Sequence, residues 1–145
     1  MAIADIDTII VVIMENRSFD HMLGYLSLPG DGRMAVEGLR ADEDWLAAHA
    51  NMHGAVPYRS KRLERTIQAL ADPNHGRAAI SVQIGTPAQG GGPMGGFVKS
   101  YVEDTTPTPP EPGRVMGYYD AGAVPVFDFF ARNFAVCDHW FAALP

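Results

Sequence analysis

Only two segments of this sequence have the pattern of a buried β-strand, and more than a hundred residues separate them. Residues 5–14 (DIDTIIVVIM) are rich in β-branched residues and apolar throughout their second half, which is typical of a strand buried on both faces of a parallel sheet. Residues 134–138 (FAVCD) form the second segment. Two strands do not complete an α/β sheet, and compact domains rarely contain so long an irregular connection. We therefore expect residues 1–145 to be the N-terminal portion of a single α/β domain.

The intervening sequence predicts short helices joined by loops. Ser18 is a typical N-cap for a short helix that extends to Leu26. Pro125 suits the first turn of a helix whose apolar face continues to Phe134. Glycine in residues 85–96 and proline in residues 105–113 predict loops there. Further helices are expected at residues 42–52, 59–71, 73–84 and 97–103.

Composition restricts the functions open to this chain. The net charge of −6 argues against binding to nucleic acid or to an anionic membrane, because both need a basic protein surface. The single cysteine, Cys137, excludes an intrachain disulfide and a thiolate metal site. The longest apolar run, residues 9–14, is too short to span a bilayer. The chain shows no signal peptide, so we expect a cytoplasmic rather than an exported protein.

The polar residues Glu15 and Asn16 follow the first predicted strand directly. In open α/β sheets the carboxyl edge of the strands is where ligands bind. A carboxylate and a carboxamide oxygen are hard donors that suit Ca²⁺, Mg²⁺ or Mn²⁺. Taken alone, such a pair more often only caps the following helix than binds a metal.

Three blocks of the sequence resemble the bacterial and plant phosphoesterase family that includes phospholipases C and acid phosphatase. They are residues 10–26 (IVVIMENRSFDHMLGYL), residues 72–97, with an Asp-Pro-x-His and a Gly-Gly-x-Met-x-Gly-Phe, and residues 116–145. Their order and approximate spacing agree with the family across nearly the whole chain. The resemblance implies an alkaline phosphatase-like fold, in which a mainly parallel sheet carries helices on both faces.

The resemblance also implies roles for particular residues. Glu15 and Asn16 correspond to metal ligands of the family, so a divalent ion (Ca, Mg, Mn or Zn) is expected as cofactor. His75 corresponds to an active-site histidine near the transferred phosphoryl group, where an imidazole can donate to a phosphate oxygen or serve as general acid. Asp72 is expected to cap the helix that follows it. The nucleophilic Ser or Thr of the family follows the third block, beyond Pro145, so we expect the 145-residue chain alone to be inactive.

The implied reaction of the complete protein is a two-step hydrolysis of a phosphate ester through a phospho-enzyme. Its substrate is expected to be a phospholipid or a small phosphomonoester. Two alternatives remain open at this point: a sulfatase-like hydrolase of the same superfamily, and a remnant that binds metal without catalysis.

Other patterns receive structural interpretations. His49 and His53 have the spacing of two ligands on one helix face, but no third ligand is evident, and we assign them to the end of a helix. The glycines of residues 90–95 lack the preceding strand of a nucleotide-binding loop. Asp138 and His139 are left out of the predicted site.

Overall fold

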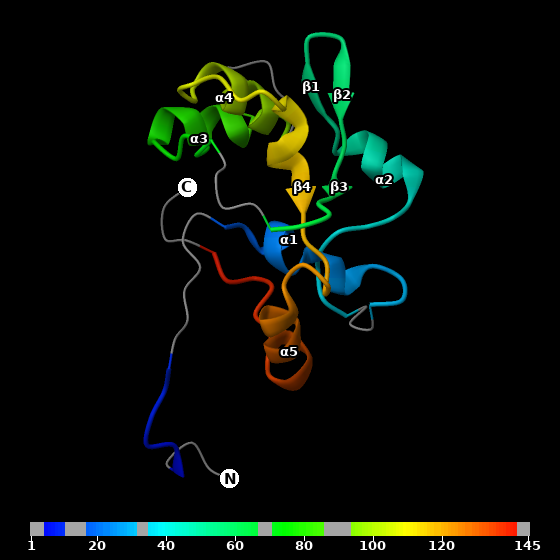
Figure 1. Ribbon diagram of the computed structural model, residues 1–145, viewed down its shortest axis with the longest axis vertical. Coiled ribbons are helices and arrows are strands. Elements are labelled where there is room, and N and C mark those ends of the chain that lie inside the picture. Colours follow the sequence, from blue (N-terminus) through cyan, green and yellow to red (C-terminus); the bar gives the residue numbers. More distant parts are fainter. Residues whose placement is uncertain (1–4, 11–16, 32–34, 67–70, 86–93, 142–145) are drawn as a thin grey trace.

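A computed structural model describes residues 5–10, 17–31, 35–66, 71–85 and 94–141 (Figure 1). Short helices and two small sheets make up the described part, an arrangement consistent with an α/β protein. None of its helices has the length and hydrophobicity needed to cross a bilayer. The helical elements are α1 (Phe19–Met22), η2 (Gly24–Ser27), α2 (Glu43–Ala48), α3 (Arg77–Gln83), α4 (Phe97–Glu103), η4 (Pro112–Met116) and α5 (Pro125–Asn133).

Two pairs of short strands hold distant parts of the chain together. Strands β1 (Asn51–His53) and β2 (Val56–Tyr58) form an antiparallel hairpin, and Gly54 in its turn has a φ of +59°, which glycine adopts without strain. Strands β3 (Lys61–Arg62) and β4 (Gly117–Tyr118) pair in parallel. The β3–β4 pair therefore brings the middle of the chain beside its C-terminal third (Figure 1).

One hydrophobic cluster packs α1 and η2 against the segment that follows β4. Tyr25 and Leu26 of η2 are fully buried in it. The Tyr25 hydroxyl donates to Asp128 Oδ1 of α5 at 2.7 Å, so the cluster also fixes the start of that helix. Its other buried members are Met22, Leu63, Tyr119, Val124 and Ala131.

A second group of elements consists of α3, α4, η4 and the β1–β2 hairpin. Buried Asn51 of β1 organises it, because the Asn51 Oδ1 accepts from the backbone N–H of Phe97 at 2.6 Å and Nδ2 donates to the Met94 carbonyl at 3.0 Å. Helices α3 and α4 meet so closely that a Cβ on Gly96 would lie 1.8 Å from the Val82 carbonyl oxygen. Only glycine fits that contact.

The structure confirms the helices that depend on local signals. Helix α4 has the predicted bounds, Ser18 caps α1, and Pro125 opens α5. The helix predicted at residues 42–52 ends at Ala48, because the chain enters β1 at Asn51. The helix predicted at residues 73–84 begins only at Arg77.

Three predicted elements are wrong in the described residues. Residues 5–10 are exposed and form no strand, and the rest of the predicted strand 5–14 lies outside the described residues. Residues 134–138 are also irregular. Neither segment has a neighbouring strand to pair with in the described part of the chain, and a strand needs that pairing. The helix predicted at residues 59–71 gives way to β3 at Lys61, because pairing with β4 overrides the local helical pattern.

Candidate functional site

The segment after Glu15 and Asn16 forms a short capped helix. The Ser18 side chain accepts from the backbone N–H of His21 at 3.2 Å, which satisfies one of the free donors at the start of α1. Arg17 and His21 are four residues apart, and the Arg17 Nη1 lies 3.1 Å from the His21 Nε2. Their side chains therefore meet beside the start of the helix.

His21 joins α1 to β4. Its Nδ1 lies 2.8 Å from the Gly117 carbonyl oxygen, and the Tyr119 backbone N–H donates to the His21 carbonyl at 2.9 Å. The His21 and Tyr119 rings pack edge to face, with centroids 4.5 Å apart. Since an arginine only donates, both ring contacts require a neutral imidazole with its proton on Nδ1. Burial lowers the pKa of His21 below its ordinary value of 6.5, and the nearby Arg17 charge lowers it further, so the neutral form is favoured.

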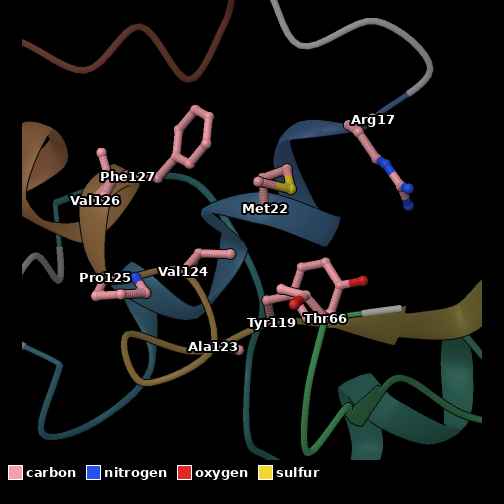
Figure 2. Close-up of a pocket in the computed structure, with 9 residues that line it drawn as sticks. All are labelled: Arg17, Met22, Thr66, Tyr119, Ala123, Val124, Pro125, Val126 and Phe127. Carbon is pink, nitrogen blue, oxygen red and sulfur yellow. The ribbon is translucent and has the colours of Figure 1, made fainter. Parts of the chain in front are cut away.

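A pocket of about 300 Å³ lies against this network (Figure 2). Arg17, Thr66 and Tyr119 provide its polar groups, and Met22 contributes from α1. The opposite wall is apolar and consists of residues 123–127, which lead into α5. Figure 2 shows Arg17 at one end of the pocket and Phe127 toward the other.

The arrangement suits a ligand with an anionic group and an apolar part. A guanidinium has five N–H donors, so Arg17 can bind His21 and still donate to the oxygens of an anion. The bond to His21 holds one side of the guanidinium in place. Thr66 is exposed and has a hydroxyl that can donate as well. The apolar wall at residues 123–127 can bury hydrocarbon.

The predicted catalytic residue, His75, lies on an exposed loop just before α3. Its Nδ1 is 3.3 Å from the Pro73 carbonyl oxygen, and it does not line the pocket beside Arg17. Asp72 does not cap α3, because the N-cap is Gly76, whose N–H donates to the Asn74 side chain at 2.8 Å. The prediction of a capping role for Asp72 was therefore wrong, and the active-site role of His75 stays a prediction.

The predicted metal ligands, Glu15 and Asn16, lie outside the described residues, directly before Arg17. Within the described ranges, no group of three His, Cys, Asp or Glu side chains could hold a metal ion. His49 and His53 do not share a helix face, because His49 is the C-cap of α2 and His53 belongs to β1. The metal site thus stays a prediction that rests on the Glu15–Asn16 pair.

Four residues of the candidate site were not predicted as site residues from the sequence: Arg17, His21, Thr66 and Tyr119. Two of them carried a detectable signal, because Arg17 and His21 lie four positions apart on either side of the predicted N-cap Ser18, where side chains about one turn apart can meet. Thr66 and Tyr119 carried none, since they reach the pocket only through the pairing of β3 with β4.

The chain is similar in sequence to known proteins. The sequence profile of the Phosphoesterase family matches residues 6–145. Over 97% of its length, the chain is 34% identical to non-specific phospholipase C1 and 32% identical to non-specific phospholipase C3, both of Arabidopsis thaliana. It is 28% identical to phospholipase C B of Mycobacterium tuberculosis over 98% of its length. The chain spans 25%, 27% and 27% of these three relatives, respectively. No solved structure gives a significant match.

Proposed function

The chain belongs to the phosphoesterase family, and from this premise we propose that it contributes part of a catalytic domain that hydrolyses phosphoric esters. The observation that carries the proposal is the pocket beside Arg17, which directly follows the expected metal ligands and combines a fixed guanidinium with an apolar wall. A phospholipid has both complementary parts, an anionic phosphodiester and hydrocarbon. The names of the similar plant and mycobacterial proteins, all phospholipases C, support the same substrate class.

Arg17 binds and orients the substrate phosphate in this proposal. Its guanidinium donates to non-bridging phosphate oxygens, which accumulate negative charge as the ester bond breaks. His21 holds the guanidinium at the correct angle through its Nε2 lone pair, and it is therefore a positioning residue. The wall at residues 123–127 excludes water from the ester and buries its apolar part.

We further propose that Glu15 and Asn16 hold a divalent ion (Ca, Mg, Mn or Zn). Their carboxylate and carboxamide oxygens fit a hard cation, and in the sequence they directly precede Arg17, a residue of the pocket. Such an ion supplies charge neutralisation at the phosphoryl oxygens when it is bound. His75 is proposed to donate to the phosphate or to the leaving alcohol. For the complete domain, an alkaline phosphatase-like sheet is part of the same proposal.

The test compares two variants of the intact protein that contains this chain. Glu15→Ala should reduce affinity for the divalent ion, measured by calorimetry, and should reduce hydrolysis of p-nitrophenyl phosphorylcholine at least about a hundred-fold. Glu64→Ala, which removes an exposed carboxylate outside the pocket, should change neither. If Glu15→Ala had normal metal affinity and a normal rate of hydrolysis, Glu15 would have only a helix-capping role. Hydrolysis of p-nitrophenyl sulfate in preference to the phosphate esters would contradict the proposed reaction.

The role of Arg17 is tested by measuring kcat and KM separately in a variant of this residue. Arg17→Lys keeps the charge but loses the planar fork that donates to two oxygens and to His21 at once. We expect it to lower kcat more than it raises KM, because the fixed donor acts on the developing charge. Equal kcat in Arg17→Lys and the unmodified enzyme would show that the guanidinium geometry is not used.

A further inference from the structure

A second pocket, of about 350 Å³, lies between α1, α2, β1 and the η4–β4 segment. It shares no lining residue with the pocket beside Arg17. Three aromatic side chains line it, namely Trp45 of α2, Phe97 of α4 and Tyr118 of β4. Its volume is near the small end of the range for ligand pockets, about 300–1,000 Å³. The pocket is therefore suited to a small molecule with an apolar surface.

The carboxylate of Asp20 also lines this pocket. It has no hydrogen-bond or ion-pair partner among the described residues. The group lies close to the backbone, because a Cβ on Gly24 would be 2.8 Å from Asp20 Oδ1. Partial burial raises the pKa of Asp20 above its ordinary value of 3.8, and the negative charge of Glu37 raises it further. Asp20 is also an exposed residue, so its ionised carboxylate is open both to solvent and to a ligand in the pocket, and it has no positively charged partner in the described part of the chain.

His21 and Asn51 supply no positive charge to Asp20, and the ring of His49, which also lines the pocket, stacks on Trp45 with the ring centroids 4.1 Å apart. His21 lines the pocket, but its ring contacts require the neutral form. Asn51 directs both its side-chain oxygen and its nitrogen to backbone groups of residues 94–98. Asp20 is therefore the acidic group of the pocket lining and can attract a cation that enters the pocket.

The chemistry of the lining selects among cations. A divalent metal needs several oxygen ligands, and Asp20 belongs to no group of three potential ligands among the residues that the structure describes. Aromatic faces instead attract organic cations, and tryptophan is the strongest of them. We propose that this pocket binds a small alkylammonium ion such as choline, with Asp20 as its counter-charge and Trp45, Phe97 and Tyr118 as its walls.

Binding is measured without turnover, so the result does not depend on the proposed esterase function. The chain has two tryptophans, and Trp140→Phe leaves Trp45 as a single reporter inside the pocket. Choline, tetramethylammonium and dimethylbutanol, the uncharged carbon analogue of choline, are titrated at constant ionic strength and followed by Trp45 fluorescence and calorimetry. Both cations should change the fluorescence and should bind at least about ten-fold more tightly than the alcohol.

Two matched variants separate the counter-charge from a general effect of net charge. Asp20→Asn should weaken choline binding at least about ten-fold, and Asp44→Asn, which removes the same charge from an exposed position of α2 outside the pocket, should not. Circular dichroism checks that each variant is folded. Choline binding that is absent in the folded protein, equal to that of the alcohol, or unchanged in Asp20→Asn would overturn the proposal.

Two further ligands define the source and selectivity of the cation. Glycerophosphocholine carries the same ammonium group on a phosphodiester, so tighter binding than choline would identify a lipid head group, and weaker binding would identify the free ion. Calcium chloride should compete poorly, because a single carboxylate is a weak calcium site. Displacement of choline by equimolar calcium would overturn the selection of an organic cation.

Discussion

Replacement of His21 by alanine should destabilise the protein and remove a specific part of its pH dependence. The change removes the donor to the carbonyl group of Gly117, which is a buried residue. Leaving that acceptor without a partner costs about 1–3 kcal/mol. It also removes the edge-to-face contact with Tyr119, which contributes about 0.5–1.5 kcal/mol beyond burial. Together these losses predict a decrease of about 1.5–4.5 kcal/mol in the free energy of unfolding near neutral pH.

The pH dependence follows from the direction of the pKa shift. His21 has a pKa below its ordinary value of 6.5 in the folded protein, so the unfolded chain binds a proton more readily. Its contribution to stability is therefore complete above about pH 6.5 and decreases as the pH falls toward the folded pKa. At about pH 5.5, one unit below the ordinary pKa, the loss from this group is at most about 1.4 kcal/mol.

Urea unfolding at about pH 7.5 and about pH 5.5, followed by circular dichroism, measures both effects. The variant His21→Asn is a useful control, because its Nδ2 can still donate to the Gly117 carbonyl although it cannot titrate. We expect His21→Asn to recover part of the stability lost in His21→Ala, and we expect both variants to show a smaller decrease at low pH than the unmodified protein. An equal decrease in all three proteins would refute the neutral, Nδ1-protonated assignment of this ring.

Three further substitutions test the packing around the two pockets. Tyr25→Phe removes a partly buried 2.7 Å bond to Asp128 and should lower the free energy of unfolding by about 1.5–3 kcal/mol, measured in urea. Asn51→Leu leaves the backbone donors at the start of α4 without their acceptor, so amide hydrogen exchange there should become much faster, and unchanged rates would contradict this role. Gly96→Ala places a Cβ 1.8 Å from the Val82 carbonyl oxygen, so thermal unfolding should show a large decrease in Tm unless α3 and α4 can separate at little cost.

Features that depend on a few neighbouring residues were predictable from the sequence. The Ser18 cap, the proline at the first turn of α5 and the bounds of α4 all follow from local backbone chemistry. The pairing of β3 with β4 was not predictable in this way, because each strand is two residues long and its partner lies far away in the sequence. Apolar, β-branched composition was misleading at Ile9 and Ile10, whose side chains are 80% and 82% exposed.

The candidate site likewise combines residues that a local motif indicates with residues that only long-range packing brings together. The family motif indicated where a site begins, and it contains both Arg17 and His21. It did not indicate that the pocket wall comes from residues 123–127, or that Asp20 faces a separate aromatic pocket, because both depend on the packing of segments that are distant in sequence. The metal ligands Glu15 and Asn16 and the histidine His75 remain predictions from the motif.

The bond between His21 and the Gly117 carbonyl spans 96 positions of the chain. Closing so large a loop has an entropic cost that must be met before the contact contributes any stability, and such long-range contacts slow folding. The walls of both pockets are therefore expected to form late, after the hairpin and the individual helices. A protease added during refolding should consequently cleave near α1 and near β4 over the same period, and both cleavages should cease together once this closure is complete.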